Sequence, residues 1–105
     1  MTTYDLSKFS PTPFGRYPND GKYNATAFRD ILTKKLIEAK QDGDELTVDL
    51  DGLTLGIGSS FLEEAFGGLV RKELFTKEEL IGKNGLLHIK SKQKFYLDEI
   101  NSYIE

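Results

Sequence analysis

The pattern of apolar and polar positions predicts alternating strands and helices along the chain. From Leu46 to Leu50 every second residue is apolar, as in a strand that buries one face. Between residues 28 and 39 the apolar side chains have the spacing of a helix with one buried face, and they are Phe28, Ile31, Leu32, Leu36 and Ala39. Similar patterns predict strands over 2–9 and 86–90 and helices over 59–71 and 92–104.

Capping and turn residues set the ends of these elements. Asn24 or Thr26 can cap the first long helix, and Gly43 suits the left-handed residue that ends it. The residues at 76–79, Thr-Lys-Glu-Glu, form a capping box that starts a short helix. After Asp51-Gly52 the apolar alternation continues through a predicted second extended piece, at Leu53, Leu55 and Ile57.

The order of elements predicts one α/β domain over residues 1–105, with helices packed against a small mixed sheet of about four strands. The segment 10–24 contains all three prolines and predicts a long loop, which its aromatic residues favour as ordered. Gly67 and Gly68 lie inside the second long helix, where each costs about 1 kcal/mol relative to alanine. A close approach to a neighbouring backbone would offset that cost.

Composition argues against several function classes. The chain has no cysteine, so it has no disulfide, thiolate metal site or cysteine nucleophile. Its 14 basic and 17 acidic residues give a net charge of -3, and a nucleic-acid partner is therefore not expected. Apolar runs are far shorter than the roughly 20 residues of a membrane helix, and the N-terminus has no secretory pattern, so we expect a cytoplasmic protein without a membrane partner.

Conventional catalysis has little support in the sequence. His88 is the only histidine, and its place in an alternating strand predicts a solvent-facing or edge position. Asp49 and Asp51 are expected to serve structural roles around a turn. The stretch from Gly56 to Phe61 matches neither the nucleophile elbow nor the dinucleotide fingerprint. We therefore expect no catalytic residue, no cofactor and no metal site.

The stretch "GIGSSFLEEAFGGL", from Gly56 to Leu69, carries the strongest candidate chemistry. One of Ser59 and Ser60 can cap the helix while the other points outward. A hydroxyl at a helix start lies where backbone N–H groups and the helix dipole stabilise negative charge, and a phosphate adds about -1.5 to -2 charges there. Capping alone accounts for one serine only.

The segment "LTVDLDGLTLGIGSSFLEEAFGGLV" resembles the centre of STAS domains, the anti-sigma-factor antagonists and their relatives. In those domains a strand leads through Asp-Ser-Ser-Gly or Asp-Ser-Thr-Gly into the second helix. A bacterial STAS-like family of unassigned function is similar in more detail, through "FGRYPNDGKYNATAFR", "VDLDG" and "GSSFLEEAFGGLVR". Gly58 and Phe61 stand where the antagonists have an acidic residue and a glycine.

The resemblance implies a non-enzymatic regulatory module that binds a partner protein. It implies Ser60 as the phosphate acceptor, with Ser59 beside it, and a histidine-kinase-like ATPase of the GHKL type as partner. The expected contact surface comprises Gly58, Ser59, Ser60 and Phe61, and the loop residues Arg16 and Tyr17 are exposed candidates for further contacts.

An alternative class stays open on the residues alone. Gly56 and Gly58 let backbone N–H groups approach a phosphate, so the Gly56–Ser60 loop can form an anion cradle for a small ligand or nucleotide. No Walker lysine follows the serines, and the next basic residue is Arg71.

Overall fold

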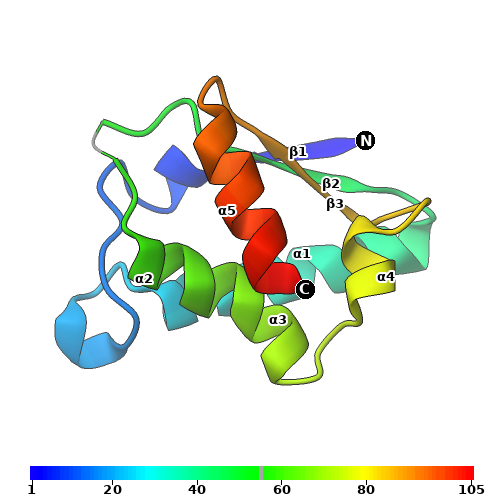
Figure 1. The fold of residues 1–105 in the computed structure, drawn as a ribbon, viewed down its shortest axis with the longest axis horizontal. Coiled ribbons are helices and arrows are strands. Elements are labelled where there is room, and N and C mark those ends of the chain that lie inside the picture. The colour runs from blue at the N-terminus through cyan, green and yellow to red at the C-terminus, as the bar shows by residue number, and fades with distance from the viewer. Residues whose placement is uncertain (55) are drawn as a thin grey trace.

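A computed structural model describes residues 1–54 and 56–105. The helices and strands follow one another in an α/β order (Figure 1). They are β1 (Thr2–Asp5), the short 3-10 helices η1 (Leu6–Lys8) and η2 (Pro18–Asp20), α1 (Ala25–Asp42), β2 (Leu46–Asp49), α2 (Ser59–Leu62), the π-helical turn η3 (Glu63–Gly67), α3 (Gly68–Arg71), α4 (Lys77–Ile81), β3 (Leu87–Lys90) and α5 (Lys94–Ile104).

Within the described residues the sheet has three strands in the order β1-β2-β3, and both pairings are parallel. The prediction of a mixed sheet of about four strands was therefore wrong. The strand expected over 2–9 ends at Asp5, because Asp5 accepts a hydrogen bond from the Ser7 backbone and starts η1. Leu53 and Ile57 lie in no strand, and Leu55, the middle of the expected second extended piece, lies outside the described residues.

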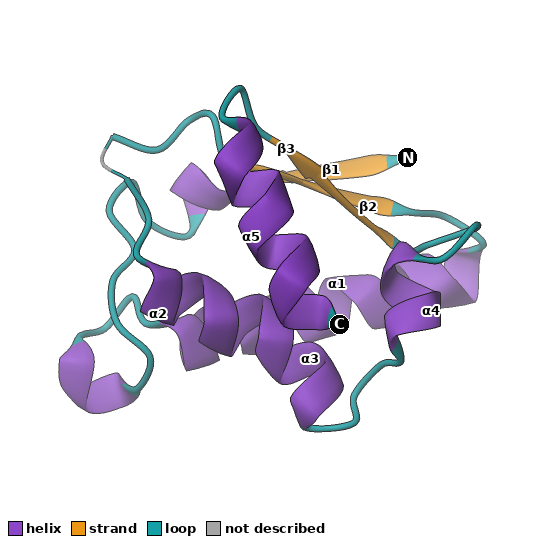
Figure 2. Ribbon diagram, in the orientation of Figure 1, coloured by secondary structure: helices purple, strands orange, loops and turns teal. Residues whose placement is uncertain are grey.

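One face of the sheet is apolar and covered, and the other is polar and open. Figure 2 shows the long helices gathered on a single side of the three strands. Leu46, Val48 and Leu87 are buried on that side, whereas His88 and Lys90 are exposed on the other. The alternation of apolar and polar residues along β2 and β3 follows directly from this one-sided cover.

The core lies between the sheet and the helices, and Phe28 of α1 is at its centre. This ring is fully buried, stacks on Tyr4 of β1 and on Phe61 of α2, and also contacts Phe9 and Phe66. One side chain therefore joins the first strand, the loop that follows it and both long helical segments.

The segments α2, η3 and α3 form one continuous helix with a π turn in its middle. The N–H of Gly68 donates to the carbonyl of Glu63, five residues earlier. A Cβ at Gly67 would lie 3.2 Å from the backbone oxygen of Tyr103 in α5, and one at Gly68 would lie 2.4 Å from Nη1 of Arg29. The expected close approach to a neighbouring backbone is confirmed at Gly67, whereas the close neighbour of Gly68 is the Arg29 side chain.

The predicted helix ends agree with the structure at three places. The Asn24 side chain accepts a hydrogen bond from the Ala27 N–H and caps α1, which ends at Gly43 with a φ of 65°. Thr76 and Glu79 form the reciprocal capping box of α4.

Glu73, in the turn after α3, gives a first testable prediction. Among the described residues it is the one non-glycine with a positive φ, at 58°. The N–H groups of Glu73 and Leu74 bond the carbonyls of Val70 and Leu69, the Schellman pattern that favours glycine at this position. Glu73→Gly is expected to raise the free energy of unfolding by about 0.5–1 kcal/mol, because it removes left-handed strain that outweighs the added chain entropy.

Urea denaturation measures this change, with Lys72→Gly as the matched control. Lys72 has a φ of -91°, so glycine relieves nothing there and should lower stability. Equal destabilisation by the two glycines would contradict the strain at Glu73.

Candidate functional site

The loop over residues 10–24 is held in a defined shape against the helices. The Asp20 carboxylate accepts the backbone N–H groups of Arg16 and Tyr17 at 3.0 and 3.1 Å. Gly15 has a φ of 82°, and its carbonyl accepts the N–H of Ala25 at the start of α1. The predicted order of this loop therefore comes from local hydrogen bonds as well as from aromatic packing.

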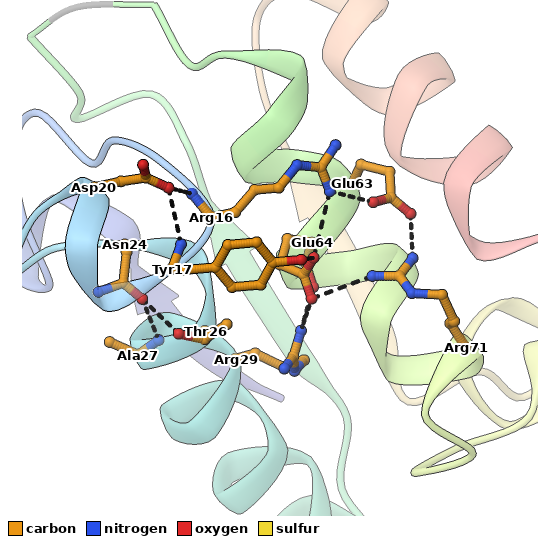
Figure 3. Close-up of polar contacts among 10 residues, drawn as sticks. All are labelled: Arg16, Tyr17, Asp20, Asn24, Thr26, Ala27, Arg29, Glu63, Glu64 and Arg71. Atoms are coloured by element: carbon orange, nitrogen blue, oxygen red, sulfur yellow. Dashed lines mark hydrogen bonds and ion pairs between the residues drawn. The ribbon is translucent and has the colours of Figure 1, made fainter.

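Beneath the loop, three arginines from separate segments surround two adjacent glutamates (Figure 3). Arg29 of α1 donates to Oε2 of Glu64 at 2.6 Å and to the Glu64 carbonyl at 2.7 Å. Arg16 donates to Oε1 of Glu63 at 2.5 Å and pairs with Glu64 at 3.3 Å. Arg71 pairs with both glutamates. We call these five residues the arginine–glutamate cluster.

Burial makes Glu64 the centre of the cluster. It is 2% exposed and Arg29 is 7% exposed, so the pair is shielded from water. Burial raises the pKa of Glu64, but the hydrogen bond from Arg29 and the charges of Arg71 and Arg29 outweigh it and hold that pKa below its ordinary value. The Tyr17 hydroxyl also donates to Glu64, at 3.2 Å. The loop is therefore tied to the π turn by charge and by a phenol.

Next to the cluster, the loop and the start of α2 enclose a hollow of about 270 Å³. Its lining combines an exposed aromatic ring, a cation and a serine hydroxyl. The lining residues are Phe14, Gly15, Arg16, Asp20, Gly58, Ser60 and Phe61. Arg16, Gly58, Ser60 and Phe61, which were predicted from the sequence as contacts, thus lie around one depression.

The serines do not cap the helix. Gly58 is the N-cap, with an extended backbone and no side-chain cap bond, and Ser59 and Ser60 are the first two helical residues. The prediction that one serine caps was wrong, because the Gly58 carbonyl already accepts the first helical N–H groups, those of Phe61 and Leu62. Both serines are exposed. Ser60 lines the hollow, while the Ser59 hydroxyl lies on the side of α5, near the Tyr103 phenol.

The other predicted contact residues differ in how much they project. Phe14, which the sequence did not single out as a contact, is 70% exposed, and Tyr17 is 50% exposed. The Arg16 guanidinium is committed to the glutamates, so Arg16 is a half-buried anchor of the loop rather than an exposed contact. Phe61 is 1% exposed and forms the floor of the hollow.

The acidic and histidine residues considered from the sequence have local structural partners. Asp49 accepts the N–H of Asp51, and Asp51 accepts the N–H of Lys92. His88 is exposed on edge strand β3, as its place in the alternating pattern predicted, and it pairs with Glu45.

The structure also bears on metal and membrane sites. Among residues 1–54 and 56–105, no group of three or more metal-ligating side chains is placed to hold an ion. No helix in that same part of the chain has the length and apolarity needed to span a bilayer.

A parallel sheet covered by helices on one side, with a serine-bearing helix start, fits a STAS-like α/β domain. A family model described as the STAS-like domain of unknown function matches residues 24–94. The chain belongs to this family, as the sequence resemblance predicted. No curated protein and no solved structure matches the chain. The matched range includes Arg29, Glu63, Glu64 and Arg71 but not Arg16 and Tyr17, so part of the site lies outside it.

Proposed function

We propose that this protein is a non-enzymatic, cytoplasmic regulatory module of bacterial origin that docks a partner protein through the hollow beside Ser60. The observation that carries the proposal is the shared hollow of Phe14, Arg16, Gly58, Ser60 and Phe61. An exposed aromatic ring beside a small concave surface is typical of residues that anchor protein–protein contacts.

The rigidity of the loop supports the same proposal. The loop is already held in one shape by Asp20 and by the arginine–glutamate cluster before any partner binds. Preorganisation of this kind lowers the entropic cost of association. The partner that the family resemblance favours is a histidine-kinase-like ATPase of the GHKL type.

Phosphorylation of Ser60 would switch this contact off. The Ser60 hydroxyl is exposed at the second position of the helix, where a negative charge is favourable for the helix itself. The same charge, facing a partner without a matching cation, would be desolvated at a cost. The nearest cation in the hollow, Arg16, is already paired with Glu63 and Glu64.

Ser60→Asp tests the docking surface and the switch together. We expect it to keep or slightly raise the melting temperature, by the equivalent of about 0.3–1 kcal/mol, and to weaken partner binding at least tenfold. Binding to the candidate ATPase is measured by calorimetry, and intact mass after incubation with that ATPase and ATP detects the phosphate. Ser102→Asp, at an exposed serine of α5, is the matched control and should bind as the wild type does.

Two results would count against the proposal. Wild-type affinity in Ser60→Asp together with an unmodified mass would refute the switch. Failure of the wild-type chain to bind the ATPase, combined with a thermal shift on adding nucleotide, would favour the anion cradle at Gly56–Ser60 instead. A nucleotide at 100 times its dissociation constant should stabilise the fold by about 2.7 kcal/mol.

A further inference from the structure

The edge strand β3 lies in a locally basic stretch of an otherwise acidic chain. Between residues 83 and 94 there are four lysines and one histidine and no acidic residue, although the whole chain has a net charge of -3. In the described part of the chain, Lys83, Lys92 and Lys94 form no ion pair, and Lys90 is 63% exposed at 3.5 Å from Asp49. This surface is on the sheet edge and does not include the hollow at Ser60.

The backbone along β3 has hydrogen-bonding groups free on its outer side. The N–H of Leu46 donates to the carbonyl of Leu86, and that of Leu50 donates to the carbonyl of Lys90. In a parallel ladder alternate residues face the neighbouring strand, so the even-numbered positions of this strand bond β2. The N–H and C=O groups of Leu87 and Ile89 therefore point away from the sheet, at its open edge.

A hollow of about 300 Å³, lined by apolar side chains and by polar groups, lies alongside this edge, between α4 and α5. Leu87 and Ile104 form its deeply buried part, and Ile81, Ile89 and Leu97 are half-buried around it. Asn101 of α5 is exposed at its rim. His88 also lines the hollow and pairs with Glu45. Lys90 projects from the other side of the sheet.

We propose that β3 accepts an extended segment of a partner protein as an added strand, and that this segment alternates apolar and acidic residues. Side chains of a strand alternate between the two sides of a sheet. The apolar residues of the segment would enter the hollow, and its acidic residues would lie beside His88 and Lys90. Backbone bonds to Leu87 and Ile89 supply affinity, and the two kinds of side chain supply specificity.

The other edge of the sheet fits this role less well. Beside β1 the hollow is only about 80 Å³ and includes the acidic residues Glu38, Asp42 and Asp44 together with Lys35. Lys35 also lies over the ring of Tyr4. A peptide is favoured over a nucleic acid because the lysines of this stretch border an open strand edge and a hollow with apolar side chains, which a phosphate backbone would leave unused.

A panel of fluorescein-labelled eight-residue peptides that alternate valine or isoleucine with glutamate is the probe. We expect at least one peptide to bind the full chain. In NMR spectra of the protein, the backbone amide signals of Leu87 and Ile89 should shift when that peptide is added. Methylation of alternate backbone nitrogens of that peptide should weaken binding at least tenfold. A peptide of the same composition with its valines and glutamates in separate blocks should also bind at least tenfold more weakly.

Substitutions in the protein separate the contribution of the hollow from the contribution of the lysine charges. Asn101→Trp fills the rim of the hollow, and Lys90→Gln with Lys92→Gln removes charge from the edge; each should weaken binding at least tenfold. Lys34→Gln with Lys72→Gln, two exposed lysines elsewhere, is the charge-matched control and should change affinity less than twofold. Circular dichroism confirms that each variant is folded.

Three results would overturn the added strand. They are the absence of binding across the whole panel, binding of the block and N-methylated peptides as tight as that of the alternating peptide, and a loss of affinity in the control lysine variant as large as in the edge lysine variant. Binding of single-stranded RNA at the same lysines in place of every peptide would overturn it as well. None of these outcomes depends on Ser60, so this surface and the proposed docking hollow are tested separately.

Discussion

Glu64→Gln is expected to lower the free energy of unfolding by about 3–5 kcal/mol, a large part of the roughly 5–15 kcal/mol typical of a domain. The reason is the fate of Arg29, which is 7% exposed and would be left as a buried charge without its carboxylate. The amide of glutamine has nearly the shape of the carboxylate, so the loss reports charge rather than a cavity. Urea denaturation at neutral pH measures it.

Glu38→Gln is the matched control, because Glu38 is exposed on α1. It should change the free energy of unfolding by no more than about 0.5 kcal/mol. Arg29→Met combined with Glu64→Gln should cost clearly less than the sum of the two single changes, since each single change already breaks the same pair. Additive losses would show that Arg29 and Glu64 do not stabilise one another.

The two glutamates of the cluster, Glu63 and Glu64, predict how the stability of the fold depends on pH. In the folded protein the pKa values of Glu63 and Glu64 lie below their ordinary value of 4.5, because burial, which raises them, is outweighed by the arginines. Their contribution to stability is therefore complete above about pH 4.5 and is lost as the pH falls through the lower, folded pKa values. The acid limb should be shallower in Glu64→Gln than in the wild type.

Phe28→Ala is expected to cost about 3–5 kcal/mol, because it removes a fully buried ring and leaves a cavity. The Phe28 ring lies 6.2 Å from the Tyr4 ring and 5.9 Å from the Phe61 ring, measured between centroids. It also contacts Phe9 at 5.6 Å and Phe66 at 6.0 Å. The loss should appear in the midpoint of urea unfolding, with the transition remaining cooperative.

Phe95→Ala tests whether the loss of stability in Phe28→Ala comes from the burial of its ring. Phe95 is 56% exposed on α5, so its removal should change stability by no more than about 0.5 kcal/mol. Because Phe61 forms the floor of the Ser60 hollow and stacks on Phe28, Phe28→Leu should weaken partner binding more than Phe95→Leu does. A similar loss of stability from both alanine variants would mean that the ring contacts of Phe28 contribute little.

Local features of the fold were predictable from the sequence, and long-range ones were not. The buried face of α1, its Asn24 cap and the capping box at Thr76 are set by residues within a few positions of each other, so spacing was enough to find them. The number of strands depends on which segments pair across the whole chain. The residues at 53–57 have alternating apolar positions, but Leu53 and Ile57 form no ladder with another strand.

The candidate site was predicted in part for the same reason. The helix start with Ser59 and Ser60 was visible as a motif, and Arg16 was singled out because it lies in the long loop that contains the prolines. The pairing of Arg29 with Glu64 was missed, because it joins residues from two helices that are 35 positions apart in the sequence. A signal was present in Gly68, since a glycine inside a helix left room for the Arg29 guanidinium.

The π turn at Glu63–Gly67 helps to set how α2 and α3 are rotated relative to each other about their common helix axis. An α-helix turns by about 100° per residue, so deletion of one residue from the α-helical part on either side of the π turn would rotate the serine end by that angle relative to the glycine end. Phe61 is anchored in the core at one end, and Gly67 is anchored against Tyr103 at the other. The residue count of this stretch is therefore a structural constraint in its own right, beside the constraints on its buried side chains.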